Sequence, residues 1–415
     1  MKSSSPTSML RWVMISLAFF ATLVNYLDRQ ALSVAAPILQ NRFQLTNIDY
    51  SHVLFAFMLA YTIMNGASGL IIDRLGTKFG YGLFVAWWSS CAMLHIFARG
   101  VWSLGILRFL VGVGEAGNWP GAVKVVAEWF RPEERSLASG IFNSGSAAGA
   151  ILAPPLIAGL VLKFGWRSAF VAVGSLGFTW LIAWMVLYQA PEEDTDSPDL
   201  PPPPALRILL QSRFVWTFTI SKIFVDPVWY FYVFWFPTYL WHARHFSLAS
   251  IGRYAWIPFF VAGMGSIGGG LIAKGFLIVK ASASGARKAA VTVAAALMLM
   301  AIPAVHVPGS ALSIAFVSIA MAGYTAALAN MLAMPGDIFP AEGVASVYGL
   351  ASMGSGFGGM VFALITGWLV ERYSYVPVFW MFGIIPLFCV AILWILMGPL
   401  EHDRQFPKES TATLV

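Results

Sequence analysis

The sequence has few charged residues, few cysteines and no cluster of metal-binding side chains. Only 11% of its residues are charged, whereas 59% are hydrophobic; soluble domains carry roughly 25% charged residues, so a water-soluble protein is excluded. Cys91 and Cys389 lie within apolar stretches, which excludes a disulfide framework. We predict no metal site and no cofactor. The net charge of +6 comes from basic residues in short loops, which is typical of membrane topology and not of nucleic-acid binding.

Long apolar runs dominate the sequence instead. A membrane-spanning helix needs about 20 mostly apolar residues. Runs of this kind cover residues 12–39, 53–72, 79–98, 100–123, 136–162, 168–190, 214–241, 254–273, 289–305, 311–334, 343–370 and 375–400. The first run contains two charged residues and is followed by the others, so we interpret it as an uncleaved helix and not as a signal peptide. The sequence therefore predicts an all-α polytopic membrane protein with twelve transmembrane helices.

The distribution of Lys and Arg predicts the orientation of these helices. If the N-terminus is cytoplasmic, the segments on the inner side hold about twice as many Lys and Arg residues as the outer loops, in keeping with the positive-inside rule. We expect a multi-pass protein of the cell (inner) membrane with both termini in the cytoplasm.

One acidic, proline-rich stretch divides the chain. PEEDTDSPDLPPPP, residues 191–204, has the composition of a solvated linker, and six predicted spans lie on each side. We predict an N-terminal six-helix bundle (1–190), a cytoplasmic linker (191–205) and a C-terminal six-helix bundle (206–415).

The two halves repeat each other. Residues 128–149 align without gaps onto residues 337–358, and glycines recur at an offset of 209 residues: Gly140 and Gly349, Gly145 and Gly354, Gly149 and Gly358. A duplicated six-helix unit is typical of transporters, whose substrate site is expected near mid-membrane where the repeats meet. We predict two pseudo-symmetric bundles.

Six charged residues fall inside predicted spans. Each charge at a helix centre costs about 2.5–3.5 kcal/mol on the insertion scale, so pairing is expected. Arg108 and Glu115 are seven residues apart, about 10 Å along a helix, so each needs a partner elsewhere. The six are Asp28 and Arg29 in the first span, Arg108 and Glu115 in the fourth, and Lys222 and Asp226 in the seventh.

These charges have predicted partners. Asp28 and Arg29 could supply partners for the fourth span, whereas Lys222 and Asp226 are four apart and can touch directly. One interpretation is a set of structural locks between helices. The other is a functional site, because intramembrane carboxylates typically carry protons and the basic groups that face them bind anions.

The buried charges of the fourth span are absent from its repeat. At the offset of 209 residues, Arg108 corresponds to Val317 and Glu115 to Tyr324. We therefore assign proton transfer to the N-terminal half.

Several motifs resemble the major facilitator superfamily over nearly the whole chain. GLIIDRLGTKFG (69–80) is similar to its loop between helices two and three, RFLVGVGEAG to its fourth-helix motif and GSAAGAILAPP to its fifth-helix motif. NYLDR, GEAGNWPGA, EWFRPEERSLASGIFN, GWRSAF and KIFVDPVWYFYVFWFP resemble the anion:cation symporters within it, and among those the hexuronate and related sugar-acid transporters.

The resemblance implies roles for individual residues. It implies proton coupling for Asp28 and Glu115 and a gate made of Asp73, Arg74 and Lys78, three residues that could otherwise be topology signals alone. It implies a substrate site made of Tyr26, Arg29, Tyr61, Arg108, Asn118, Asn143, Lys222, Asp226, Trp229 and Asn330.

The expected function is proton-coupled uptake of an anionic sugar acid, most simply galacturonate or glucuronate, by alternating access. We expect a monomer in the lipid bilayer that is driven by the proton gradient and has no catalytic residues. The alternatives are another organic anion such as an aldonate or glucarate, a drug exporter, a membrane enzyme acting on lipid-linked sugars, and a nutrient sensor. We interpret His95 as a helix residue whose hydrogen bonds are satisfied.

Overall fold

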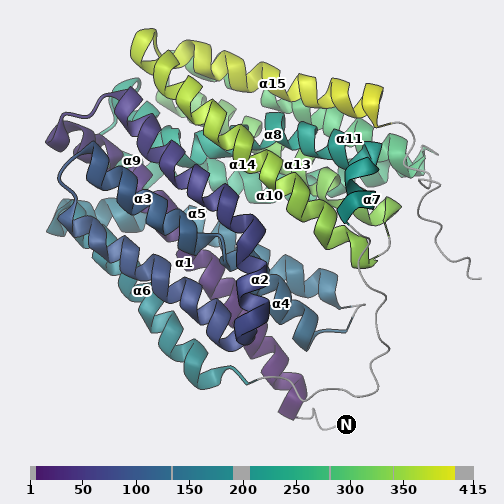
Figure 1. The fold of residues 1–415 in the computed structure, drawn as a ribbon. Coiled ribbons are helices and arrows are strands. Elements are labelled where there is room, and N and C mark those ends of the chain that lie inside the picture. The colour runs from purple at the N-terminus through teal and green to yellow at the C-terminus, as the bar shows by residue number, and fades with distance from the viewer. Residues whose placement is uncertain (1–5, 132–133, 190–205, 280–281, 340, 398–415) are drawn as a thin grey trace, which may run out of the picture. The chain divides into compact units, whose positions relative to one another are not determined.

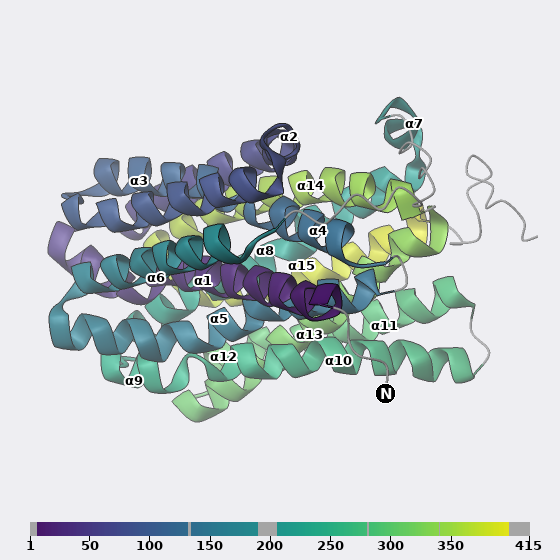
Figure 2. The same cartoon turned by 90° about the horizontal axis from the view of Figure 1, so that it is seen from below.

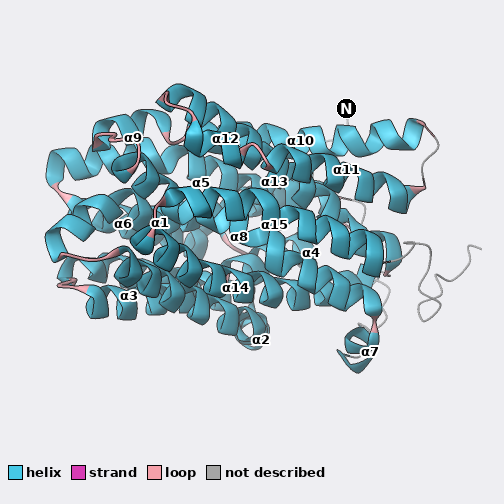
Figure 3. Ribbon diagram, turned by 90° about the horizontal axis from the view of Figure 1, so that it is seen from above, coloured by secondary structure: helices cyan, strands magenta, loops and turns pink. Residues whose placement is uncertain are grey.

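The computed structural model describes residues 6–131, 134–189, 206–279, 282–339 and 341–397. Within these ranges the chain is helical, with short loops and without β-strands (Figure 3). Helices suit a bilayer because they satisfy all backbone hydrogen bonds within one segment. The predicted linker 191–205 lies outside the described residues.

The described helices follow the predicted order of spans (Figure 1). They are α1 (Pro6–Phe43), α2 (Asn47–Leu94), the 3-10 turn η1 (His95–Phe97), α3 (Val101–Glu115), α4 (Asn118–Trp129), α5 (Arg135–Phe164), α6 (Trp166–Leu187), α7 (Leu206–Gln211), α8 (Arg213–His242), α9 (Leu248–Tyr254), α10 (Ile257–Ile278), α11 (Ala283–Met298), α12 (Ala301–His306), α13 (Ser310–Ile338), α14 (Ala341–Arg372) and α15 (Tyr375–Leu396).

The described residues form two compact units that do not follow the sequence halves. Unit 1 contains residues within 1–195, 230–259 and 359–375, and unit 2 contains residues within 196–229, 260–358 and 376–415. Helices α8, α10 and α14 each contribute to both units. The predicted bundles 1–190 and 206–415 are defined by the linker, with six predicted spans on each side of it, and stay a prediction.

Helix α2 contains two predicted spans. Among the described residues, nine helical stretches are long and apolar enough to cross a membrane, and the longest, Asn47–Phe97, covers both 53–72 and 79–98. Its helical geometry is interrupted at Gly76, which has φ 75° and ψ 156°. This left-handed φ is strained for residues other than glycine, so Gly76 is where the chain turns between the two spans. Helix α3 packs along α2 (Figure 2).

The fourth predicted span, 100–123, is not continuous. Its hydrogen-bond pattern is interrupted between α3 and α4 at Ala116 and Gly117, although both residues keep right-handed helical dihedral angles. Pro120 has no N–H to donate to the carbonyl of Ala116, which a continuous helix would require. The Ser68 hydroxyl donates to that carbonyl instead, at 3.1 Å. The break makes Glu115 the last residue of α3.

Glycines bring two pairs of helices into close contact. In unit 1, Gly145 and Gly149 of α5 lie against the backbone of α1. In unit 2, Gly354 and Gly358 of α14 lie against the backbone of α8 in the same way. These four glycines are two of the three glycine pairs that repeat at an offset of 209 residues, so this part of the internal repeat in the sequence is also a repeat in helix packing.

Candidate functional site

Arg29 and Glu115 form a buried ion pair in unit 1. Arg29 lies in the middle of α1, and Glu115 is placed by the break after α3. The Nε and Nη2 atoms of Arg29 lie 3.0 and 2.9 Å from Oε2 of Glu115. Their side chains are 3% and 0% exposed. The prediction that the first span supplies the partner of Glu115 is confirmed.

Three aromatic rings surround the Arg29 guanidinium. Its Cζ atom lies 4.8 Å from the ring centroid of Tyr61, 5.2 Å from that of Tyr26 and 5.4 Å from that of Phe57. Aromatic faces attract a cation, most strongly where water is excluded. Both tyrosines were predicted from the sequence as site residues. Phe57 was not, although Phe57 and Tyr61 are four residues apart and therefore share one face of α2.

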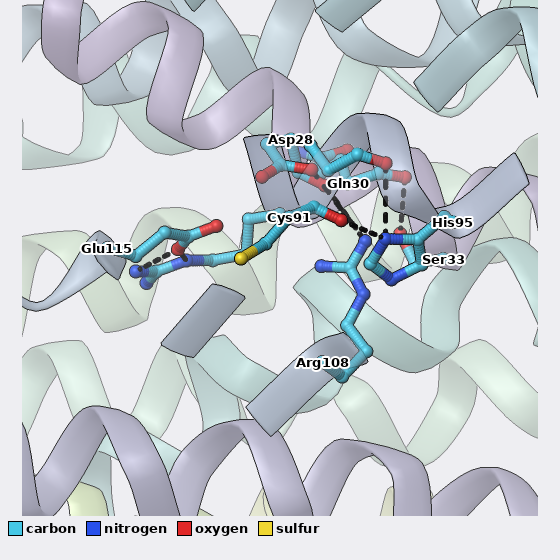
Figure 4. Close-up of polar contacts among 9 residues, drawn as sticks. Asp28, Gln30, Ser33, Cys91, His95, Arg108 and Glu115 are labelled. Atoms are coloured by element: carbon cyan, nitrogen blue, oxygen red, sulfur yellow. Dashed lines mark hydrogen bonds and ion pairs between the residues drawn. The ribbon is translucent and has the colours of Figure 1, made fainter. Parts of the chain in front are cut away.

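Asp28 and Arg108 form a looser pair. Nη2 of Arg108 lies 3.8 Å from Oδ1 of Asp28 and 3.5 Å from the backbone oxygen of the same residue (Figure 4). Neither carboxylate oxygen of Asp28 has a hydrogen-bond partner among the described residues, and the side chain is fully buried. The predicted pairing is confirmed, but this carboxylate lacks the donors that Glu115 receives from Arg29.

His95 lies beside this pair (Figure 4). Its Nδ1 atom is 2.9 Å from the carbonyl oxygen of Cys91 and 3.2 Å from that of Ala92. The imidazole therefore provides a hydrogen-bond partner for carbonyl groups at the end of α2. Its Nε2 atom is buried and has no partner among the described residues. The interpretation of His95 as a fully satisfied helix residue is therefore wrong for one of its two nitrogens. Cys91 itself is a free, buried cysteine, as is Cys389.

Unit 2 holds a second buried pair. Nζ of Lys222 lies 2.7 Å from Oδ2 of Asp226, as their spacing predicted. The hydroxyl of Tyr324 donates to the other carboxylate oxygen at 3.2 Å. Trp229 stacks on the ring of Tyr324 with centroids 5.5 Å apart. Tyr324, the repeat counterpart of Glu115, was noted in the sequence as the site of a lost charge and not as a partner of Asp226.

The three predicted asparagines do not share one environment. Asn118 is buried, accepts from the Tyr81 hydroxyl at 2.9 Å and donates to Thr22 at 3.2 Å. Asn330 is buried, and its amide nitrogen donates to two backbone carbonyls. Asn143 is exposed. The amides of Asn118 and Asn330 therefore tie helices together.

The predicted gate residues make separate contacts. Asp73 pairs with Lys124 at 2.7 Å, and Nζ of Lys78 donates to the backbone oxygen of Tyr188 at 3.0 Å. Arg74 is exposed, and no ion pair joins it to another described residue. The structure does not bring these three side chains into one cluster.

A hydrogen-bonded acid lies next to Lys78. Glu128 accepts from Thr77 at 2.5 Å and from the Tyr188 hydroxyl at 2.6 Å. Burial, followed by the neighbouring Glu128 carboxylate, raises the pKa of Tyr188 well above its ordinary value. The phenol therefore stays a donor at physiological pH, and α2, α4 and the end of α6 are held together. Within the described residues, no group of three or more His, Cys, Asp or Glu could hold a metal ion.

The arrangement of long apolar helices with paired charges buried among them is that of a membrane transporter, and the sequence agrees. The Major Facilitator Superfamily profile matches residues 18–322 and 275–414. The chain belongs to this superfamily and has its fold, to which the twelve predicted spans correspond; it is a transporter and not an enzyme.

Several relatives and solved structures are similar to this chain. The hexuronate transporter of Escherichia coli strain K12 is 29% identical over 412 residues, covering 94% of each protein. The galacturonate transporter of Dickeya chrysanthemi is 32% identical over 308 residues, covering 70% of this chain and 89% of the relative. The crystal structure of a D-xylose-proton symporter shares the fold, with a TM-score of 0.75, 13% identity and coverage of 94% of this chain and 98% of that one.

Proposed function

We propose that the chain is a proton-coupled symporter that works by alternating access. Its proposed substrate is a hexuronate, either galacturonate or glucuronate. Relatives named as hexuronate and galacturonate transporters support the substrate class. The observation that carries the proposal is the pair of buried arginine–carboxylate contacts in unit 1, Arg29 with Glu115 and Arg108 with Asp28. Structural locks alone would be better made by apolar packing, which avoids the desolvation of four charges.

The proposed coupling follows from competition between the substrate carboxylate and the protein's own carboxylates for the two arginines. A guanidinium binds the carboxylate of a sugar acid with the same geometry that it uses for Asp or Glu. Protonation of Glu115 removes the charge that holds Arg29, and protonation of Asp28 does the same for Arg108. Each arginine is then available to the substrate anion, so proton binding favours substrate binding. Release of the substrate returns each arginine to its carboxylate, which then loses its proton.

Unit 2 supports a different role for its own charges. Both oxygens of Asp226 already have partners, in Lys222 and Tyr324. Loss of the Asp226 charge would leave the buried Lys222 ammonium without its carboxylate partner, so we propose that Asp226 is not a proton carrier. Trp229, stacked on Tyr324, is the proposed aromatic surface for a sugar ring.

Counterflow in proteoliposomes tests the substrate. Purified protein would be reconstituted and loaded with unlabelled galacturonate, glucuronate or galactonate, and entry of the radiolabelled compound would be measured. We expect exchange of both hexuronates and weaker exchange of galactonate. Exchange of galactonate or glucarate alone would replace the hexuronate with another sugar acid. Exchange of apolar cations would instead support a drug exporter, which the fixed buried arginines disfavour.

The remaining features of the proposal concern the cell. We propose a monomer in the inner membrane, with both termini in the cytoplasm and the proton gradient as the energy source. The orientation is supported by the excess of Lys and Arg in the segments assigned to the inner side. Labelling of single cysteines placed in alternate loops, in intact cells and in inverted vesicles, would test the orientation.

A further inference from the structure

His95 is a buried imidazole that the proposed cycle does not use. Its two nitrogens are in different states. Carbonyl oxygens only accept hydrogen bonds, so Nδ1, which lies within 3.2 Å of two of them, carries the hydrogen. In the neutral ring Nε2 is then a bare acceptor, and it has no partner among the described residues. The ring is held in place by stacking on Phe170, with centroids 4.7 Å apart and planes 10° apart.

A complementary group belongs to Arg108. Its guanidinium packs on the same Phe170 ring, with Cζ 5.9 Å from the centroid, and it lies beside the imidazole in Figure 4. The Nε–H of Arg108 is itself buried and without a partner among the described residues. An unused donor and an unused acceptor therefore share one aromatic surface.

The charges around His95 favour a neutral ring. The basic groups nearby are Arg108 on α3 and Arg167 on α6, whose Nε donates to the backbone oxygen of Ile96 at 2.8 Å. The acidic and weakly acidic ones are Asp28 on α1 and, on α2, Tyr50 and the Cys91 thiol. A protonated imidazole would be repelled by the Arg108 guanidinium. The ring therefore acts as a hydrogen-bond acceptor.

We propose that His95 is a positioning residue for Arg108. When Asp28 takes up a proton, Arg108 loses its anionic partner, and a guanidinium in the membrane needs other acceptors. His95 Nε2 is the acceptor that holds the guanidinium until the substrate carboxylate arrives. This inference rests on the proposed function, because it assumes that Arg108 binds the anion while Asp28 is neutral.

A comparison of His95 variants in two backgrounds tests the role. Full-length protein in lipid nanodiscs would be titrated calorimetrically with galacturonate, with native Asp28 and with Asp28→Asn, which imitates the protonated acid. His95→Asn keeps a donor at the Nδ1 position but has no acceptor at the Nε2 position, whereas the amide of His95→Gln reaches that position. In the Asp28→Asn background we expect His95→Asn to weaken binding about tenfold, the effect of one hydrogen bond to a charged group, and His95→Gln to restore most of it. With native Asp28 the loss should be much smaller.

The outcomes separate this inference from the proposed function. If the wild-type chain binds neither galacturonate nor glucuronate, the proposed function fails. If it binds them but His95→Asn has the same effect in both backgrounds, His95 is only structural and the inference is overturned. His52→Asn, at an exposed position of α2, is the matched control and should match the wild type.

A spectroscopic measurement covers the case in which His95→Asn does not fold. In protein labelled with 15N-histidine, Nε2 of His95 should show the shift of a bare acceptor in the native chain. The shift should move toward that of a hydrogen-bonded acceptor in Asp28→Asn. An unchanged shift would refute the proposed contact with Arg108.

Discussion

In the proposed cycle, Glu115 links protonation to anion binding through its contact with Arg29. In Glu115→Gln the side chain keeps its shape but cannot ionise, so it imitates the protonated acid. Arg29 is then always available to the substrate carboxylate. We expect counterflow of galacturonate to continue, because exchange moves no net proton, and pH-driven accumulation to disappear. Uptake at an imposed pH gradient in proteoliposomes measures this. Glu134→Gln, in a part-exposed pair with Arg11, is the control and should accumulate normally. Full accumulation by folded Glu115→Gln would exclude Glu115 as the coupling group.

The Tyr324 hydroxyl donates a hydrogen bond to Asp226, and we expect this contact to contribute to stability and not to proton transfer. Tyr324→Phe would keep the stacking on Trp229 and remove the hydrogen bond to the carboxylate. Hydrogen bonds to charged groups contribute about 1.5–3 kcal/mol, so we expect a lower thermal unfolding midpoint and retained pH-driven accumulation. Differential scanning fluorimetry and the same uptake assay would show both. Tyr373→Phe, at an exposed position, is the control and should change neither the unfolding midpoint nor the accumulation. Loss of accumulation in Tyr324→Phe would contradict this prediction and would indicate that Asp226 carries a proton.

The pairing of buried charges could be predicted from the sequence because burial of an unpaired charge is so unfavourable. With three acidic and three basic residues in the spans, spacing alone left few combinations. The aromatic surroundings of Arg29 could be predicted only in part, because Phe57 looks like an ordinary apolar residue of a span. The unused nitrogen of His95 depends on side-chain orientation, which residue spacing does not specify.

At the scale of helices, close packing through glycine makes a specific prediction. A side chain at Gly149 would meet the Leu23 carbonyl of α1, and one at Gly358 would meet the Ile223 carbonyl of α8. Backbone cannot move aside as a flexible side chain can, so overpacking here costs at least about 1–3 kcal/mol. We expect Gly149→Leu and Gly358→Leu each to reduce the yield of folded protein strongly, as measured by size-exclusion chromatography of a fluorescent fusion.

The chain offers matched controls for this prediction. Gly140 and Gly349 lie on the same two helices, and an added Cβ at either would have open space around it. Leucine at these exposed positions should leave the yield of folded protein unchanged. Equal losses at all four positions would show that helix α5 and helix α14 tolerate no leucine at all, and would contradict the packing argument.

The helices themselves were predictable, whereas their interruptions were less so. Apolar runs located each span because their length matches the bilayer. The break after Glu115 was missed, although Pro120 four residues beyond Ala116 is the signal for it. Whether such a proline bends a helix or breaks it depends on a partner for the freed carbonyl. That partner, Ser68, lies 48 residues away in the sequence.

At the scale of the whole molecule, alternating access as proposed would separate contacts that join distant parts of the chain. Glu371, in the last turn of α14, accepts from the backbone N–H and the side-chain amide of Asn47 at 2.8 and 2.9 Å. A carboxylate is favoured at this position, because the first N–H groups of α2 are otherwise unpaired. Gln40 and His242 extend the contact to α1 and α8. Asn47 and Glu371 are separated by 324 positions in the sequence, so residue spacing could not predict this contact.

This contact should open once in every cycle if the chain works by alternating access. Asn47→Cys and Glu371→Cys, introduced together and joined by a short bifunctional thiol reagent, would hold α2 and α14 together at the end predicted to face outward. We expect galacturonate uptake to stop on crosslinking and to return when a cleavable reagent is reduced. Each single-cysteine variant treated with the reagent should keep its uptake, and the native cysteines are buried. Full uptake by the crosslinked protein would mean that α2 and α14 move as one body, and that substrate enters by a route that does not separate them.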